Sequence, residues 1–374
     1  MFIVLVGITL LVVLTLEFFY FRSLIGRFLS FWGFDPTAKK VKIAKYLIIA
    51  LFMGTTVPIF TVVGMLSLHI FVLSAFIDLC CLIIKLIFKK QWKPLRFISS
   101  SLVLPVIIGV GAVIYGYINM HTVVKTEYEI ETSKDLTQDY KVAFISDVHM
   151  GISLDLEEIK EIADEISSQK PHLLLLGGDI VDESTTLEDM KELFKIFGDV
   201  DTVYGTFFVY GNHDDLGFSG SRGNYTDADL RNAILDAGIT LLEDDVVNIG
   251  TDLALVGRLD SSYKGKDKER RQSIDSLLSG VDKEKFILVL DHQPVEYEEK
   301  EQGGVDLSVS GHTHAGQIWP LGVFTTIVAN NEDSYGLTKS GSFHAIVSSG
   351  IAGWGFPIKT AESAEYLMIT VCGK

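Results

Sequence analysis

The sequence predicts two structural regions in one chain, an all-α membrane region at the N-terminus and an α/β domain after it. Residues 1–118 carry eleven Lys or Arg against three acids, a net charge of +8, and are rich in Leu, Ile, Val and Phe. Residues 119–374 carry 21 basic and 45 acidic residues, a net charge of −24, and their short apolar runs alternate with helical patterns. Apolar stretches of about 20 residues can cross a bilayer, and strands alternating with helices are typical of an α/β sheet.

Four membrane-spanning helices are expected in the first region. Residues 46–77 carry no charge and the apolar character continues to Phe88, which is long enough for two spans joined by a tight turn near Gly64. Two basic connections, at 22–45 and 85–96, decide the count. Four spans place both connections on the cytoplasmic face, as the positive-inside rule requires, whereas three spans place them on opposite faces. The expected spans lie at about 2–21, 46–63, 66–88 and 97–118.

This topology predicts a multi-pass protein of the cell membrane, with both ends of the chain and the acidic domain outside the cytoplasm. No basic segment precedes the first span and no small-residue cleavage site follows it, so we expect the span to be retained. Asp78 lies within the third span. This acid could have a function, or it could simply lie near a membrane end or pair with a neighbouring helix, and the sequence leaves these interpretations open.

The second region is expected to begin with a linker that becomes an edge strand, at 119–140, and to continue as an α/β domain over 141–374. Five short apolar runs, YKVAFIS and FILVL among them, end in polar clusters, and helical patterns such as LEEIKEIADEISSQ lie between the runs. In α/β folds ligands collect at the carboxyl ends of the strands, so five strands should deliver their polar ends to one place. The polar residues at these ends are Asp147, His149, Asp179, Asn212, His213, His292, His312 and His314.

The chemistry of this set favours a metal site. Carboxylates, imidazoles and an amide together suit Mn, Fe or Zn better than Ca or Mg. They are too many for one tetrahedral zinc, and two metals that share a carboxylate would use them. In the crowded stretch SVSGHTHAGQ, His312 and His314 are one residue apart, so each could hold a different metal of the pair. Glycines at 177, 178, 211 and 311 would let the backbone turn sharply and come close to the ions.

Each of these residues also has an ordinary structural interpretation. Asp147 or Asp179 at a strand end can cap a helix or form a turn, and His292 two residues before Pro294 can simply pack. However, five of the nine histidines follow successive strands, and the structural interpretations would all have to hold at once. The combination therefore predicts a functional site.

The motifs, in their order along the chain, resemble the calcineurin-like metallophosphoesterase family. They are Asp-x-His at 147–149, Gly-Gly-Asp at 177–179, Gly-Asn-His-Asp at 211–214, a single His at 292 and Gly-His-x-His at 311–314. The resemblance covers roughly 140–372, and the stretches GHTHAGQ and VSSGIAGWGFPIK further resemble a membrane-anchored bacterial branch. It implies a four-layer α/β/β/α sandwich with two mixed sheets and two divalent metal ions, of which Mn is favoured over Fe or Zn.

The resemblance also implies a role for each residue of the motifs. It makes Asp179 the carboxylate that bridges the metals, His213 the general acid and Asp214 the residue that orients His213. The branch often has Arg where this chain has Lys359, and Lys is not a bidentate phosphate donor like Arg. The implied ligands are Asp147, His149 and His314 for the first metal and Asn212, His292 and His312 for the second.

Three further residues are candidates for substrate contact, each with an alternative. Arg258 follows an apolar run and could bind phosphate or form a surface salt bridge. Arg222 lies in the Gly- and Ser-rich stretch 218–227, which could cover the site or be a plain surface loop. Trp354 could line the substrate rim, although packing is the more usual role of Trp.

The expected activity is hydrolysis of a phosphodiester, phosphomonoester or pyrophosphate bond by a metal-bridging hydroxide. The membrane spans favour a lipid-linked or envelope substrate. Two alternatives stay open: a tethered phosphoesterase for soluble nucleotides, and a metal-binding sensor or scaffold without activity. The acidic surface argues against a nucleic-acid partner, because phosphate contacts need Lys and Arg. The sequence leaves the oligomeric state open.

Overall fold

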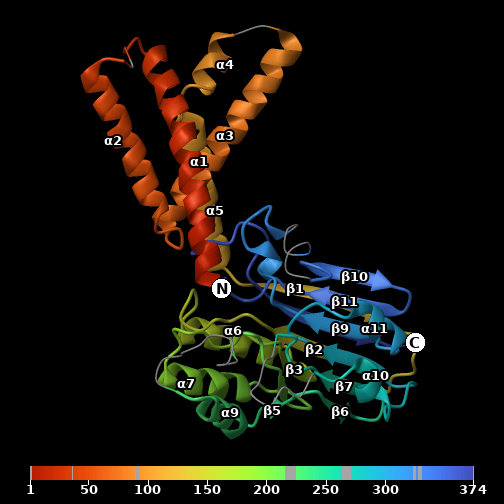
Figure 1. Cartoon of the computed structure of the whole chain (residues 1–374). Helices are drawn as coiled ribbons and strands as arrows, with labels where there is room; N and C mark the ends of the chain where they lie inside the picture. The colour runs from red at the N-terminus through yellow and green to blue at the C-terminus, as the bar shows by residue number, and fades with distance from the viewer. Residues whose placement is uncertain are drawn as a thin grey trace. The chain divides into compact units, whose positions relative to one another are not determined.

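The computed structural model describes residues 2–35, 37–89, 92–214, 225–262, 271–322, 326 and 331–373, and for 2–6 the backbone alone. The chain forms two compact units, Met1–Tyr117 and Ile118–Lys374. The first unit is helical, and the second contains every strand of the described residues (Figure 1).

The helices of the first unit differ in whether they can cross a membrane. In the described part of the chain, three segments are long and apolar enough, Gly7–Phe31, Val62–Phe88 and Val103–Met120. The 18-residue helix α2 is not one of them, because it begins with the lysine-rich KKVKIAK. The prediction of four spans is therefore not confirmed. The helices are α1 (Phe2–Phe31), α2 (Lys39–Thr56), α3 (Val62–Phe88), α4 (Lys93–Ile98) and α5 (Val103–Met120).

The predicted turn near Gly64 is wrong. The chain turns between Thr56 and Val62, and Gly64 lies in the first turn of α3, where its N–H donates a hydrogen bond to the Thr61 hydroxyl at 3.2 Å. Pro58 follows the end of α2 by two residues, as is common where a helix stops. A Cβ on Gly64 would overlap the carbonyl group of Pro58, so glycine here serves the close packing of the turn.

Two acids inside the helical unit have partners. Asp78 of α3 accepts hydrogen bonds from Arg27 and, at 2.9 Å, from the Tyr20 hydroxyl, and both donors lie on α1. Glu17 is fully buried and accepts a hydrogen bond from the Thr56 hydroxyl at 2.9 Å. Asp78 thus pairs with a neighbouring helix, which was the structural alternative, and such pairing offsets the cost of an acid in apolar surroundings.

The second unit contains two six-stranded sheets, and both are mixed, as predicted. In the first sheet only the β12–β2 pair is antiparallel, and in the second only the β10–β11 and β6–β7 pairs are. The first sheet has the order β1 (Val124–Glu131), β12 (Glu365–Cys372), β2 (Tyr140–Ile145), β3 (Leu173–Leu176), β4 (Thr206–Phe208) and β5 (Thr240–Leu241). The second has the order β10 (Gly336–Ser340), β11 (Phe343–Val347), β9 (Leu307–Ser310), β8 (Phe286–Leu290), β7 (Leu253–Gly257) and β6 (Asp245–Ile249).

Apolar clusters join these sheets to each other and to the helices. One cluster contains residues of both sheets, Phe144 and Leu288 among them, and both are fully buried. A second cluster joins the first sheet to its helices through residues such as Phe194 and Ile234, and a third joins the second sheet to Ile274. The helices of this unit are α6 (Leu156–Ser168), α7 (Leu187–Gly198), α9 (Asp227–Asp236), α10 (Ile274–Leu278) and α11 (Tyr297–Gln302).

Local sequence explains the elements that carry the site. β3 reads LLLL and is buried at all four positions, as expected of a parallel strand covered on both faces. α6 begins at a capping box, in which the Asp155 side chain accepts from the Glu158 N–H and the Glu158 side chain accepts from the Asp155 N–H. Repeating this order of buried strand, polar loop and capped helix places the polar residues at the carboxyl ends of the strands.

Candidate metal centre

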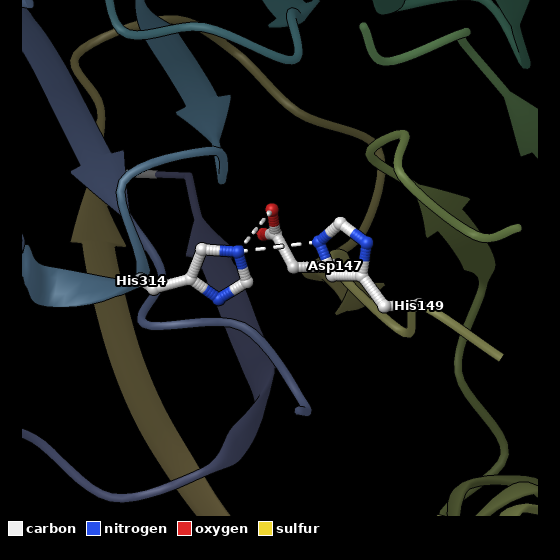
Figure 2. Close-up of side chains that lie close together, drawn as sticks. All are labelled: Asp147, His149 and His314. Atoms are coloured by element: carbon white, nitrogen blue, oxygen red, sulfur yellow. Dashed lines mark hydrogen bonds and ion pairs between the residues drawn. The ribbon is translucent and has the colours of Figure 1, made fainter. Parts of the chain in front are cut away.

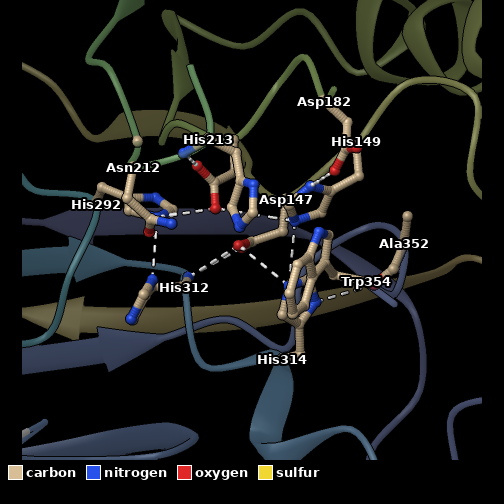
Figure 3. Close-up of polar contacts among 12 residues, drawn as sticks. Asp147, His149, Asp182, Asn212, His213, His292, His312, His314, Ala352 and Trp354 are labelled. Atoms are coloured by element: carbon tan, nitrogen blue, oxygen red, sulfur yellow. Dashed lines mark hydrogen bonds and ion pairs between the residues drawn. The ribbon is translucent and has the colours of Figure 1, made fainter. Parts of the chain in front are cut away.

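The structure brings the eight predicted strand-end residues together (Figure 3). They come from the loops after five strands, each of which is parallel to at least one neighbour in its sheet. β2 leads to Asp147 and His149, β3 to Asp179, β4 to Asn212 and His213, β8 to His292, and β9 to His312 and His314. The two sheets therefore contribute to one site.

The first cluster consists of Asp147, His149 and His314. One ligand atom from each lies within 4.8 Å of the others, and all three residues are buried. The Nε2 atoms of His149 and His314 are 3.2 Å apart, and His314 Nε2 lies 3.7 Å from a carboxylate oxygen of Asp147 (Figure 2). These three residues are the predicted ligands of the first metal.

The second cluster consists of Asp179, His292 and His312. His292 Nε2 lies 3.2 Å from an Asp179 oxygen, 3.2 Å from His312 Nδ1 and 3.2 Å from the Asn212 amide oxygen. The same Asp179 oxygen lies 3.8 Å from His149 Nε2 of the first cluster. Asp179 therefore stands between the two clusters, where a carboxylate shared by two cations would have to be.

Hydrogen bonds on the far side of the rings orient three of the histidines. His149 Nδ1 lies 3.0 Å from Asp182, His292 Nδ1 lies 2.8 Å from the carbonyl oxygen of Gly177, and His314 Nδ1 lies 3.3 Å from that of Ala352. If Nδ1 donates in each pair, Nε2 keeps its lone pair for a cation, which is the usual arrangement around metal-ligating histidine.

Sequence reasoning missed Asp182, although a signal for it exists. Asp182 is buried, follows Asp179 by three residues, and also forms a possible ligand group with His149 and His213. The short segment GGDIVD contains two acids, so the second, Asp182, was a candidate for the same site as Asp179. The contact with His149 itself joins loops 33 residues apart and is visible only in the folded chain.

Glycines allow the loops to approach each other closely, as predicted. Gly178 has a φ of +86°, and a Cβ there would lie 2.8 Å from Nδ1 of His292. A Cβ on Gly211 would overlap the Asp179 carboxylate, and one on Gly311 would overlap that of Asp147. Only glycine leaves the space that these carboxylates occupy.

Backbone strain is concentrated in the same residues. The φ angles of Asp147, His149, Asp179, His312 and His314 are +56°, +42°, +53°, +71° and +49°. This left-handed region is uncommon for residues other than glycine and is typical of functional sites that hold side chains in fixed positions. The donor types, the shared carboxylate and the strain together fit a pair of divalent cations.

Residues 140–316 match the sequence profile of the family described as calcineurin-like phosphoesterase. This segment is a calcineurin-like phosphoesterase domain. The predicted resemblance is thus confirmed. The chain is 30% identical over 241 residues to an uncharacterized metallophosphoesterase of Helicobacter pylori strain J99, and the match covers 64% of this chain and 61% of the relative.

Two more distant relatives are also named for a metallophosphoesterase. Uncharacterized metallophosphoesterase YkuE of Bacillus subtilis is 25% identical over 263 residues, which cover 68% of this chain and 87% of the relative. A Danio rerio protein named transmembrane protein with metallophosphoesterase domain is 25% identical over 291 residues, which cover 72% of this chain and 62% of the relative. This chain therefore spans about three fifths of the Helicobacter and Danio relatives.

Burial and neighbouring charge in the phosphoesterase domain set the protonation of the ligands. Burial lowers the pKa of His314 to about 3 and that of His312 to about 4, so both rings are neutral at pH 7. Burial also opposes ionisation of Asp179, but the nearby His292, His213 and His149 outweigh it and lower its pKa. Burial disfavours protonation of His292, but the Asp179 carboxylate in turn raises its pKa, so binding of a metal there would release a proton, because a metal ligates the neutral imidazole.

His213 lies beside the clusters rather than within the ligand set proposed for either metal. Its Nδ1 is 3.2 Å from a Glu183 oxygen, and its ring packs against those of His149 and Trp354 at 5.1 and 4.9 Å between centroids. Burial disfavours the imidazolium, but the hydrogen bond to Glu183 and the charge of Asp179 raise its pKa. The surroundings thus favour the protonated ring that a general acid needs. Sequence reasoning missed Glu183.

Asp214 secures the backbone that carries Asp179. Its carboxylate accepts hydrogen bonds from the N–H groups of Asp179 at 2.6 Å, Ile180 at 3.0 Å, Val181 at 3.0 Å and Gly211 at 2.8 Å. These bonds hold the loop after β3 in its strained conformation. The role predicted for Asp214, to orient His213, stays a prediction.

The three predicted substrate contacts lie in different surroundings. Trp354 packs against His213 at the edge of the metal clusters (Figure 3). Arg222 lies outside the described residues. Arg258 is fully buried, and its guanidinium donates to Asp244 and Glu296 at 3.0 Å each. Arg258 thus forms salt bridges, as in the structural alternative, but inside the domain rather than on its surface, and a guanidinium held by two carboxylates there is poorly placed for phosphate.

Lys359, at the position where the resembling branch often has Arg, lies inside the domain. The residue is fully buried, and its ammonium donates to the carbonyl groups of Ser349, Gly350 and Ala352. Burial lowers the pKa of Lys359 to about 7. Lys359 thus holds together the loop whose Ala352 carbonyl faces His314, and it supports a predicted ligand rather than a substrate.

Proposed function

We propose that this protein is a membrane-anchored phosphohydrolase with two divalent metal ions, which cleaves a phosphodiester, phosphomonoester or pyrophosphate bond. The observation that carries the proposal is the place of the Asp179 carboxylate, 3.2 Å from His292 in one cluster and 3.8 Å from His149 in the other. Mn²⁺ is the favoured ion, because the site mixes carboxylate, imidazole and amide ligands.

The residues divide into two ligand groups and an acid. When bound, the two cations lower the pKa of water and offset the negative charge of the phosphoryl oxygens. Asp179 belongs to both groups. His213, held protonated by Glu183, gives its proton to the leaving oxygen, and Trp354 limits the movement of its ring. The other ligands are Asp147, His149 and His314 for one cation and Asn212, His292 and His312 for the other.

A broad panel of substrates is needed, because two other functions compete with a lipid-linked or envelope substrate. A tethered enzyme for soluble nucleotides would have the same metal clusters. So would a metal-binding sensor or scaffold, but such a protein would not need a protonated histidine beside the clusters. The contact of His213 with Glu183 therefore favours a hydrolase.

The experiment uses the full chain in detergent micelles. After removal of metal and addition of Mn²⁺, we expect hydrolysis of bis-p-nitrophenyl phosphate, and we expect Asp179→Asn to lower kcat by about 10³-fold because a metal supplies several kcal/mol of transition-state stabilisation. Asp199→Asn, at an exposed acid of the same domain, is the matched control.

The outcomes separate the candidate functions. The hydrolase is supported if turnover depends on metal and is lost in Asp179→Asn but not in Asp199→Asn. A comparison of activity on lipid pyrophosphates and on nucleotides then identifies the substrate class. Two bound metals with no turnover on any of these substrates would favour the sensor or scaffold. Equal activity of Asp179→Asn and Asp199→Asn would contradict the proposed site.

We also infer that α1, α2, α3 and α5 all span the membrane, with the phosphoesterase domain outside the cytoplasm. The support is the charge pattern, since this count places both basic connections on the cytoplasmic side. Three apolar helices and a relative named as a transmembrane protein support the membrane location. Protease added to intact cells should remove the phosphoesterase domain, and a domain that survives until the cells are lysed would contradict the orientation.

A further inference from the structure

The helical unit contains a large polar cavity, although most of its surface is apolar. The cavity has a volume of about 960 Å³ and is lined from α1, α2, α3, α4 and the segment after α4. Its polar lining consists of Ser23, Arg27, Ser30, Lys45, Asp78, Lys85, Arg96, Ser99 and Ser100. All of these residues belong to the one compact unit.

The charges around this cavity are unbalanced. Four of the lining residues are basic, and Asp78 is the single acid, so the lining has a net charge of +3. Asp78 is already paired with Arg27. Among the described residues, no hydrogen bond or ion pair joins the side chains of Lys45, Lys85 or Arg96 to another protein group. These three cations line one cavity without a counter-charge from the protein, although the side chains of Lys85 and Arg96 also reach solvent, and an anion among them would reduce their mutual repulsion.

Lys45 is held toward the cavity by close packing. A Cβ added to Gly26 of α1 would lie only 3.1 Å from the Lys45 ammonium nitrogen, so the end of the Lys45 side chain rests directly on α1. The positive-inside rule explains why lysines lie on the cytoplasmic side of the membrane, but it does not require their side chains to point into a cavity between helices. Lys42 lies on the same helix, but it is exposed and does not line the cavity. The two lysines of α2 therefore differ in whether they reach the cavity.

An apolar cavity adjoins the basic one. Its volume is about 470 Å³, and Ser100 lines both cavities. The other lining residues are Leu24, Ile25, Phe28, Ile48, Leu102, Val103, Val106 and Ile107. A basic compartment beside an apolar one has the chemical character of an anionic lipid, with a phosphate at one end and hydrocarbon at the other.

We propose that the helical unit binds a phospholipid, whose phosphate lies among Lys45, Lys85 and Arg96 and whose acyl chain enters the apolar cavity. Phosphate fits this lining because the guanidinium and ammonium groups are strong donors to its oxygens and the serine hydroxyls add further donors. Basic pockets between membrane helices bind lipid headgroups by the same chemistry. The proposal is independent of the metal centre, which lies in the other unit.

The test measures lipid binding by the full chain in detergent micelles, with a fluorescent phosphatidylglycerol as the probe. Lys45→Gln and Arg96→Gln should each raise the Kd about fivefold, since a basic residue near an anionic headgroup contributes about 1 kcal/mol. The double variant should raise it about 25-fold if the effects add. Lys42→Gln on α2 and Lys93→Gln on α4 are matched controls outside the cavity lining, and we expect less than a twofold change.

Competition experiments identify the source of the phosphate. Unlabelled phosphatidylglycerol should displace the probe, whereas inorganic phosphate at the same concentration should not, because it cannot use the apolar cavity. If inorganic phosphate displaced the probe and unlabelled phosphatidylglycerol did not, the ligand of the cavity would be a soluble phosphate, and the proposal would be overturned. Equal losses in Lys42→Gln and Lys45→Gln would show that general charge attraction, not the cavity, binds the probe. Gly26→Ala, which crowds Lys45 without removing charge, should also weaken binding.

Discussion

The two units of this chain use their acids in opposite ways. In the phosphoesterase domain, Asp147 and Asp179 stand among histidines at the ends of strands, in groups that could hold a metal ion. In the helical unit, Asp78 is the single acid in a cavity lined by four bases, and it neutralises one of them. Whether a site suits cations or anions therefore depends on which charge is in excess around it.

The largest effect should come from His213→Gln. This change removes the proposed acid without removing a carboxylate, so kcat should fall by about 10²–10⁴-fold for a phosphodiester with an alkyl leaving group. A p-nitrophenolate needs no proton, so turnover of bis-p-nitrophenyl phosphate should change much less. The measurement is kcat on both substrates. An equal loss of kcat on both substrates would contradict the role of His213 as an acid. If His213→Gln also changed lipid binding by the helical unit, the two sites would not be independent.

An intermediate effect is expected from Asp182→Asn. The Asp182 carboxylate lies 3.0 Å from Nδ1 of His149 and orients that ring, so Mn²⁺ affinity should fall about 10–100-fold, as for other partners of metal-ligating histidine. Calorimetric titration of the metal-stripped full chain with Mn²⁺ measures this. The control is Glu188→Gln, at an exposed acid six residues further on. Unchanged affinity in Asp182→Asn would assign Asp182 to packing alone.

The smallest effect should have the opposite sign. Asp78→Asn removes the single acid of the basic cavity and frees Arg27, so phosphatidylglycerol affinity should rise about fivefold. Asp35→Asn, at an exposed acid in the same unit that does not line the cavity, should leave affinity unchanged. Binding by labelled lipid measures both. If Asp78→Asn weakened lipid binding instead, Asp78 would be needed to position Arg27. The acids of both units would then contribute to binding, and the contrast between the units would be lost.

Sequence reasoning could group the candidate metal ligands because their signal is local. Each follows a short apolar run, and parallel strands bring such ends to one edge, so Asp147 and His312 could be grouped although 165 residues separate them. The glycines were predictable for the same reason. A backbone that must pass close to a carboxylate excludes a Cβ, and Gly211 and Gly311 stand beside the ligands in the sequence itself.

The supporting residues were not predictable in this way. The burial of Arg258 depends on Asp244 and Glu296, which are 14 and 38 residues away, and nothing near Arg258 in the sequence announces them. The partners of Lys359 are backbone carbonyl groups of its own loop, and the sequence does not show the conformation of that loop, because the conformation depends on packing. The turn before α3 was misplaced because Gly64 is a turn signal by composition, whereas the Thr61 cap placed the helix start earlier.

Charge and hydropathy along the chain were enough to predict the division into a basic apolar region and an acidic α/β region, because both are properties of neighbouring residues. The order of the motifs carried the resemblance to the family, and that resemblance implied the two mixed sheets. The folded chain was needed to see that Asp179 lies between two clusters, that Asp182 and Glu183 contact the histidines, and that four bases of the helical unit line one cavity. Those facts depend on distances between distant segments, and such distances exist only once the chain has packed.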